Sequence, residues 1–252
     1  MEQFIELQNL QTSIFTLVSH STTRDLHKHE TAQLSVPQNG IIYFMVEGQL
    51  YMIPPNTAIY IPANIHHCIY KTNNKIIIEN IYFSKKYFDL LPQITRAVTL
   101  TDLAKILIER LCKISKDDLD NNKTQQMLEL LLDELKEINN KLEFNLKIPQ
   151  NEGLRQIFNH VANNESANLP NLESCASAIN VSPRSLQRII KQELGISFIL
   201  WRGQILFMKS LELIHKHKST SIVSYMLGYN SESAFISMFK KFSHGKTPSD
   251  FY

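Results

Sequence analysis

Long apolar runs are missing from this 252-residue chain, and so is the usual beginning of a secreted protein. No stretch approaches the roughly 20 apolar residues that a bilayer-spanning helix needs, so we expect no membrane segment. The first residues, Met1-Glu2-Gln3-Phe4, do not form a basic region followed by an apolar core. We therefore expect no secretory signal and a cytoplasmic protein.

Cysteines and excess charge are also scarce. The three cysteines, Cys68, Cys112 and Cys175, are odd in number and widely spaced, which excludes a disulfide framework or a CxxC metal knuckle. The net charge of +2 neither favours nor excludes a nucleic-acid partner. Residues 151–252 hold 11 Lys+Arg against 7 Asp+Glu, whereas residues 1–150 carry a balance of −2. The C-terminal part is therefore the better candidate for contact with phosphate.

The pattern from Thr22 to about Phe83 is typical of β-structure. Short runs rich in Ile, Tyr and Phe, such as residues 41–46 and 75–83, are separated by Gly, Pro and Asn. Short strands at close spacing with such breaks predict a small sandwich or barrel.

Two helices are predicted after residue 91. The first spans Thr101 to Ile114, and its predicted apolar side carries Leu103, Ile106, Leu107 and Leu111. The second spans Thr124 to Leu142, with an apolar stripe of Met127, Leu131, Leu135, Ile138 and Leu142 backed by Leu128 and Leu132. The stripe approximates a heptad, so it indicates either burial against the β-domain or a dimer seam, and apolar periodicity does not separate the two.

From Glu152 onward the pattern is almost entirely helical, and it contains a first helix-turn-helix unit. A short helix over Leu172–Ala178 is followed by a turn at residues 180–182 and a second helix over Pro183–Glu193. Ser182 is a suitable N-cap before a proline at the first helical position, and Gly195 ends the helix. Its polar face carries Arg184, Ser185, Gln187, Arg188 and Lys191. Arg can bind a guanine edge and Gln an adenine edge, so this face predicts major-groove recognition.

A second unit repeats the arrangement. A helix over Ser221–Leu227 and a turn at residues 228–230 precede Ser231, which can cap a helix over Glu232–Phe242. That helix is expected to bury Phe235, Phe239 and Phe242. Between the units, a longer helix over Phe198–His215 has Trp201, Ile205, Met208, Leu211 and Leu213 as apolar anchors.

These C-terminal residues resemble the AraC/XylS family of transcription regulators, through the segment Gly228 to Phe235 and the terminal Gly245-Lys246-Thr247-Pro248. The resemblance implies a homodimer on duplex DNA, two units in successive major grooves about 34 Å apart, and contact with RNA polymerase if the protein is an activator. Ser237 and Leu206 replace arginines common in the family. The second unit is then expected to read bases weakly, through Glu232, Ser233 and Ser237, and to hold the backbone through Lys240 and Lys241.

Histidines in the N-terminal half form a second pattern. His27 and His29 are two residues apart and so share one face of a strand, Gln33 follows, and His66 and His67 come after Pro62. This pattern resembles a cupin barrel and implies His27, His29 and His67 as metal ligands, with Gln33 in the usual Glu place. Asn64 replaces a Gly of the pattern, and His66 competes with its neighbour. Neutral imidazoles suit Zn, Ni, Cu or Fe, and the alternative is an organic ligand without metal.

Together these patterns predict an α+β protein with three parts. We expect a cupin-like β-barrel sensor over residues 1–90, a helical linker and dimerisation segment over 91–148, and a double helix-turn-helix domain over 149–252. The predicted function is DNA-binding transcription regulation in response to a small molecule or metal. A metal-dependent cupin enzyme with a DNA-binding tail is the alternative, against which Gln33 cannot transfer protons as Glu can. A metal buffer or trafficking protein is a third reading, which the C-terminal pattern makes unnecessary.

Overall fold

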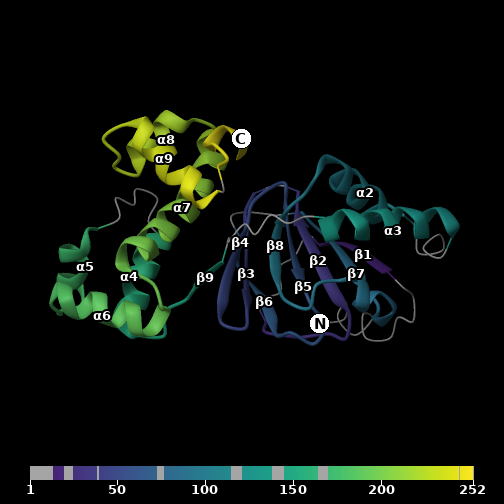
Figure 1. The fold of residues 1–252 in the computed structure, drawn as a ribbon, viewed down its shortest axis with the longest axis horizontal. Coiled ribbons are helices and arrows are strands. Elements are labelled where there is room, and N and C mark those ends of the chain that lie inside the picture. Colours follow the sequence, from purple (N-terminus) through teal and green to yellow (C-terminus); the bar gives the residue numbers. More distant parts are fainter. Residues whose placement is uncertain are drawn as a thin grey trace. The chain divides into compact units, whose positions relative to one another are not determined.

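The computed structural model describes residues 14–19, 25–38, 40–72, 77–114, 121–137, 145–163, 170–243 and 245–251. The chain forms two compact units, Met1–Asn145 and Leu146–Tyr252. In these ranges the first unit contains two sheets and the helices α2 and α3, and the second is helical after its first residues (Figure 1). Within these ranges, no helix is both long and apolar enough to cross a membrane.

The strands of the first unit form two sheets rather than one closed barrel. The five-stranded sheet has the order β1 (Ile14–Ser19), β7 (Ile78–Phe83), β2 (Ala32–Pro37), β5 (Thr57–Ile61) and β8 (Arg96–Thr99). The second sheet has β6 (His67–Thr72), β3 (Ile42–Val46) and β4 (Gln49–Ile53) in that order, and β9 (Asn145–Lys147) lies at the boundary between the units in the sequence. The α+β fold class is confirmed, and of the predicted sandwich or barrel the described strands form two separate sheets rather than one closed barrel.

Strand β2 is buried on both faces. Its side chains alternate between an apolar face and a polar face. Ala32, Leu34 and Val36 belong to an apolar cluster with residues of α2 (Asp102–Cys112) and α3 (Asn122–Glu137). Gln33 and Ser35 lie on the opposite face and are also buried. The helices therefore cover one face of the five-stranded sheet, while the other face carries buried polar groups. A 3-10 helix, η1 (Lys85–Leu90), follows β7.

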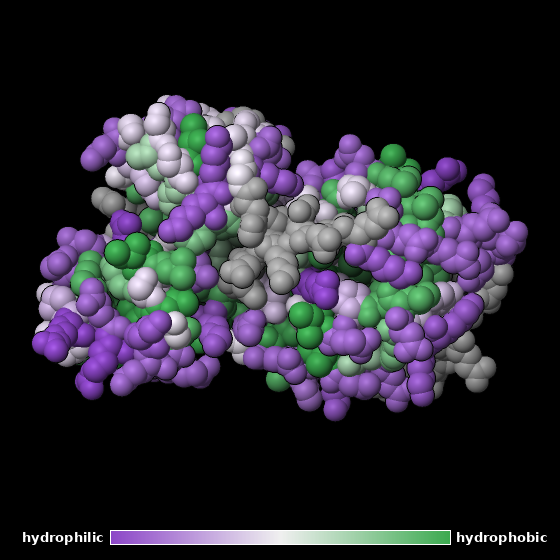
Figure 2. Space-filling model, in the orientation of Figure 1, coloured by the Kyte–Doolittle hydropathy of each residue, from purple (hydrophilic) through white to green (hydrophobic). Residues whose placement is uncertain are grey.

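The predicted apolar side of α2 is wrong at two positions. Leu103 and Ile106 are 41% and 55% exposed, and the buried side is made by Ala104, Leu107, Ile108 and Leu111. These four residues follow the 3.6-residue period with a stripe shifted by one position, which the sequence also permits. In Figure 2, apolar surface is visible over the position of α2.

The described part of α3 packs inward. Four leucines of the predicted stripe and its backing are buried in the same cluster as α2, with Met127 partly buried beside them: Leu128, Leu131, Leu132 and Leu135. Burial against the sheet and α2 therefore accounts for these leucines. Ile138 and Leu142 lie outside the residues that the structure describes.

The second unit contains α4 (Glu152–Asn163), α5 (Leu172–Ala178), α6 (Pro183–Leu194), α7 (Phe198–His217), α8 (Thr220–Met226), α9 (Glu232–Phe242) and the 3-10 helix η3 (Pro248–Phe251). Helix α7 is the most buried of these, and all five predicted anchors on it are buried. Its Phe207 ring lies 5.0 Å from Phe239 and 5.9 Å from Phe242 between ring centroids. This aromatic contact fixes α9 on α7.

The predicted helix ends are confirmed. The Ser182 side chain accepts a hydrogen bond from the Ser185 amide, and Gly195 ends α6 in the left-handed conformation with φ 76°. The Ser231 side chain accepts a bond from the Ala234 amide at the start of α9. Phe242, which was predicted to be buried, is half-buried. Local capping therefore sets where both second helices begin.

Candidate functional site

The predicted recognition face of α6 points to solvent. The side chains of Arg184, Gln187, Arg188 and Lys191 are exposed, on the side of the helix opposite to buried Leu186 and Ile190. Ser185 is half-buried, and its hydroxyl lies 2.9 Å from the Ser182 hydroxyl. Lys191 donates to the carbonyl oxygen of Gly195 at 2.9 Å. Two arginines and a glutamine on one exposed face are what bidentate contacts with base edges require.

Helix α9 presents a different face. The predicted DNA-contacting residues Glu232, Ser233, Ser237, Lys240 and Lys241 are all exposed. The Ser237 hydroxyl donates to the carbonyl oxygen of Ser233 at 2.9 Å, within the helix itself. The centre of the second exposed face is therefore made of short side chains, with the cations only near the C-terminal end of the helix.

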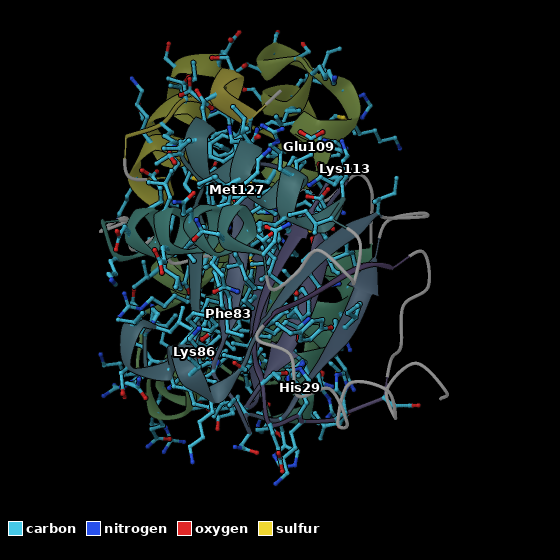
Figure 3. All side chains as sticks on the ribbon, turned by 90° about the vertical axis from the view of Figure 1, so that its right-hand side faces the viewer. His29, Phe83, Lys86, Glu109, Lys113 and Met127 are labelled. Carbon is cyan, nitrogen blue, oxygen red and sulfur yellow. The ribbon has the colours of Figure 1, made fainter. Side chains whose placement is uncertain are left out.

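The three predicted histidines come together where the two sheets meet. His27 and His67 form an isolated β-bridge, with N–O distances of 3.0 and 2.9 Å, that joins the segment before β2 to β6. One side-chain nitrogen from each of His27, His29 and His67 lies within 4.8 Å of the others. His29 and His67 are buried, and His27 is half-buried. Figure 3 shows His29 well apart from Glu109 and Lys113 of α2.

Each ring of this histidine cluster is oriented by a backbone carbonyl. The Nδ1 atoms lie 2.8, 2.7 and 2.9 Å from the carbonyl oxygens of Asp25, Thr31 and Ile65, for His27, His29 and His67 respectively. A carbonyl only accepts, so each Nδ1 carries the proton and a neutral ring keeps its lone pair on Nε2. Metal-bound histidines are commonly held in this way.

Burial keeps two of the rings neutral. Burial lowers the pKa of His67 to about 3, and the neighbouring histidines add to this effect. Burial also lowers the pKa of His29, with a further contribution from His27. The His67 Nε2 atom is buried and has no hydrogen-bond partner within the described part of the chain. Neutral imidazoles with converging lone pairs fit a divalent transition metal or a hydrogen-bond donor on a small molecule.

A buried polar network continues inward from the cluster. Gln33 Oε1 lies 3.0 Å from His29 Nε2, while Gln33 Nε2 donates to Ser35 Oγ at 2.8 Å and to Asn80 Oδ1 at 3.0 Å. Ser35 Oγ donates to Asn80 Oδ1 at 2.6 Å. Ser35 and Asn80 are functional candidates that the sequence reasoning missed. Their signal was a pair of polar residues in each of two largely apolar strands, Gln33 with Ser35 in β2 and Glu79 with Asn80 in β7.

The structure also explains two departures from the cupin pattern. Asn64 adopts φ 62°, a left-handed conformation that Gly takes freely and that Asn tolerates, and its amide donates to the His29 carbonyl at 2.8 Å. His66 is exposed and is not part of the histidine cluster. His67 is therefore the member of the His66–His67 pair that faces the site.

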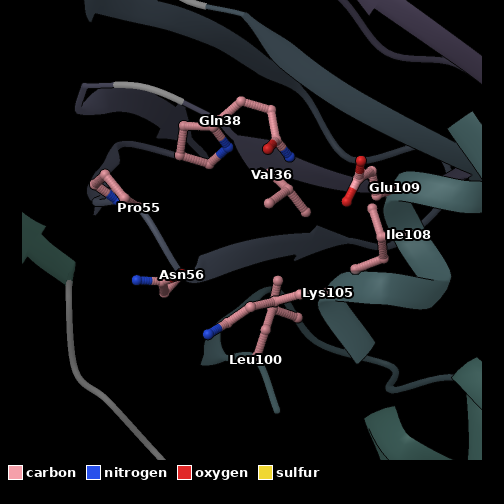
Figure 4. Close-up of a pocket in the computed structure, with 9 residues that line it drawn as sticks. Val36, Gln38, Pro55, Asn56, Leu100, Lys105, Ile108 and Glu109 are labelled. Carbon is pink, nitrogen blue, oxygen red and sulfur yellow. The ribbon is translucent and has the colours of Figure 1, made fainter. Parts of the chain in front are cut away.

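A pocket of about 230 Å³ lies elsewhere in the same unit, between one end of the five-stranded sheet and α2 (Figure 4). Its walls include Val36, Pro55 and Ile108, and its charged side chains are Lys105 and Glu109. Lys105 pairs with Asp102 at 3.0 Å, and Glu109 pairs with Lys113. None of the predicted site residues lines this pocket.

Comparison with known proteins connects these surfaces to a class of proteins. Residues 175–252 match the family model described as "Helix-turn-helix domain". The chain is 28% identical over 226 residues to the HTH-type transcriptional regulator NimR of Escherichia coli K12, covering 90% of this chain and 81% of NimR. It is 22% identical over 237 residues to the HTH-type transcriptional activator RhaS of Shigella sonnei, covering 85% and 83%. This chain is therefore a helix-turn-helix transcription regulator.

The matched C-terminal helix-turn-helix domain is of the AraC type, as the resemblance of these residues predicted. Among solved structures, ToxT from Vibrio cholerae aligns over 96% of this chain and 97% of its own, at 11% identity and a TM-score of 0.38.

Proposed function

We propose that this chain is a sequence-specific DNA-binding regulator whose histidine cluster senses a small molecule or a metal ion. The observation that carries the proposal is the exposed Arg184, Gln187 and Arg188 face of α6, inside the matched helix-turn-helix domain. The second helix of such a unit lies in the major groove. Arg184 and Arg188 would donate to guanine edges and Gln187 to adenine, with Ser185 and Lys191 at the margin.

The second unit contributes mainly affinity. Lys240 and Lys241 would contact phosphates, which position a protein on the duplex without reading its sequence. Two serines on this face, Ser233 and Ser237, have short side chains, and Glu232 is negatively charged, so they add little contact with guanine. Glu232 can accept a hydrogen bond from cytosine. The two units would enter successive major grooves of one duplex.

The sensor unit would act by shifting the equilibrium between two arrangements of the regulator. A ligand bound by His27, His29, His67 and Gln33 changes DNA affinity only if it prefers one arrangement of the regulator. A homodimer suits this mechanism, and its contact is proposed on the helical segment over residues 91–148, where Leu103, Ile106 and Leu130 are exposed. If the protein is an activator, RNA polymerase is a further partner, and the cytoplasm is the proposed location.

The histidine cluster gives no support to the enzyme alternative. In the described ranges, the cluster consists of three histidines and no carboxylate. The residue in the usual Glu place is an amide, which cannot act as a general acid or base. The two relatives are named as transcription regulators.

The test is DNA binding by the full chain, measured by fluorescence anisotropy on the DNA that adjoins its own gene. Arg184→Ala and Arg188→Ala together should remove the preference for this DNA over a scrambled duplex. Arg155→Ala is the matched control, because Arg155 is an exposed arginine of α4 that pairs with Glu152 at 2.6 Å. Equal preference in the double variant and the wild type would contradict the assignment of α6.

A further inference from the structure

The contact between His29 and Gln33 brings two lone pairs together. His29 Nδ1 lies 2.7 Å from the Thr31 carbonyl oxygen and 3.1 Å from the Thr31 hydroxyl. Because the carbonyl only accepts, the shorter contact places the proton on Nδ1, so Nε2 is an acceptor when the ring is neutral. Gln33 Oε1, which is also an acceptor, faces this Nε2 atom at 3.0 Å. Such a contact needs a proton on Nε2, a turned amide, or a cation that both atoms bind.

A protonated His29 is the least favourable of these. The ring is 6% exposed, and its centroid lies 6.1 Å from that of His27 and 5.0 Å from that of His67. No carboxylate belongs to the cluster in the described part of the chain. A buried positive charge without a negative partner is costly, so the ring stays neutral.

A cation satisfies every group in the observed arrangement. One nitrogen of each ring lies within 4.8 Å of the others, and because each Nδ1 faces a carbonyl, Nε2 is the nitrogen left to bind an ion. Gln33 Oε1 lies 3.0 Å from His29 Nε2. Three imidazole nitrogens and an amide oxygen form a neutral donor set that suits Zn²⁺ or Co²⁺. The amide nitrogen of Gln33 then keeps both of its observed acceptors, Ser35 Oγ and Asn80 Oδ1.

We propose that the Gln33 amide is a two-position switch that follows occupancy of the histidine cluster by a divalent metal ion. With the ion bound, Oε1 faces the ion. Without it, the amide turns over, so that its N–H donates to His29 Nε2. This inference rests on the proposed sensing function of the cluster, and it commits that site to an ion.

Turning the amide reverses hydrogen bonds deeper in the unit. Gln33 Oε1 would then face Ser35 and Asn80, so Ser35 must donate to Gln33 and Asn80 must present its own N–H groups. Ser35 and Asn80 are direct partners across strands β2 and β7. The opposite face of these two strands belongs to the cluster that packs on α2 and α3. Ion binding thereby changes contacts between the two strands that support the helical layer.

Nuclear magnetic resonance of the ¹⁵N-labelled full chain tests the switch directly. In the ion-free protein, a nitrogen–nitrogen coupling across the hydrogen bond should connect Gln33 Nε2 to His29 Nε2. Addition of one equivalent of Zn²⁺ should abolish this coupling, because both atoms then change partners. A coupling that persists with Zn²⁺ bound, or that is missing from the ion-free protein, would overturn the switch.

Two variants locate the effect in the network. Asn80→Asp offers only acceptors to Gln33, so it should hold the amide in the ion-bound position, remove the coupling even without Zn²⁺, and tighten Zn²⁺ binding about tenfold. Gln33→Leu should weaken Zn²⁺ binding and change the visible absorption of bound Co²⁺. His66→Ala, next to the cluster but exposed, is the control and should leave both measurements unchanged. Retention of the coupling in Asn80→Asp, or of the wild-type Co²⁺ spectrum in Gln33→Leu, would contradict the proposal.

The same preparation separates this inference from the proposed function. If the wild-type chain binds its DNA specifically but takes up neither Zn²⁺ nor Co²⁺, the ion switch is wrong and the regulator function stands. If a folded chain shows no specific DNA binding while the Zn²⁺-dependent coupling change is present, the regulator function fails and the ion switch stands.

Discussion

Substitution of Gly203 by Ala should destabilise the second unit, because α7 and α9 approach each other too closely for a methyl group. A Cβ atom at Gly203 would lie 2.5 Å from Cζ and 2.8 Å from Cε2 of Phe242. Ordinary carbon contacts are about 3.5–4.0 Å, so the ring must move by about 1 Å. Such a movement disturbs the stacking of this ring on Phe207, where the interplanar angle is 23°.

The expected magnitude is a balance of two effects. Overpacking of this kind costs about 1–3 kcal/mol, whereas Ala is better than Gly inside a helix by about 1 kcal/mol. A contact of 2.5 Å places the overpacking cost in the upper part of that range, about 2–3 kcal/mol, so we expect Gly203→Ala to lower the free energy of unfolding by about 1–2 kcal/mol. Because Phe242 ends α9, the second recognition helix should also shift and lose affinity for DNA.

The single tryptophan makes the measurement selective. Trp201 is 0% exposed and lies on α7, so urea unfolding followed by its fluorescence reports on the second unit. Phe242→Leu should restore stability to Gly203→Ala by vacating the clashing position. Gly153→Ala is the milder comparison, with its nearest contact at 3.0 Å from Ile179 Cδ1. Stability equal to or above that of the wild type in Gly203→Ala would refute the reasoning.

Three further outcomes are expected. Arg188→Ala alone should weaken specific DNA binding by about 1–3 kcal/mol, and unchanged affinity for the operator in anisotropy would remove Arg188 from the base contacts. His27→Ala with His29→Ala should abolish the effector response but leave DNA affinity without effector nearly intact, whereas failure of this variant to fold, seen by circular dichroism, would make the histidines structural. In the ion-free protein, burial lowers the pKa of His67 to about 3, so the unfolded chain binds the proton more readily and stability falls as pH decreases from about 6.5 towards 3. The slope should be about 1.4 kcal/mol per pH unit for this group, and a flat acid profile for the sensor unit in urea titrations would contradict it.

The sequence predicted best what local chemistry determines. Ser182, Gly195 and Ser231 act within one turn of the chain, so their caps could be placed without knowledge of the tertiary structure. The buried side of α2 was wrong because a 3.6-residue period leaves the centre of a broad apolar stripe uncertain by one position. The packing of α2 in the tertiary structure then decides that Leu103 is exposed and Ala104 is buried.

The missed part of the site depends on strand pairing. Ser35 and Asn80 are 45 positions apart and meet only because β2 pairs with β7 in one register. Nothing local in the sequence specifies that register. The sequence placed His27 and His29 on one face of a strand; both precede β2 instead, and their ring centroids still lie 6.1 Å apart. The closeness of His67 was implied by resemblance alone. The prediction of the DNA-contacting residues remains to be tested by the variants above.

The isolated bridge between His27 and His67 has a consequence for finding the natural effector. Outside that bridge, His27 lies in no strand, so a ligand held by all three histidines would fasten the two sheets to each other at this point. Such a ligand binds the folded unit and not the unfolded chain. At 100 times its dissociation constant it adds about 2.7 kcal/mol to the free energy of unfolding. A melting-temperature screen of the purified protein can therefore identify the effector without any knowledge of the genes that the regulator controls.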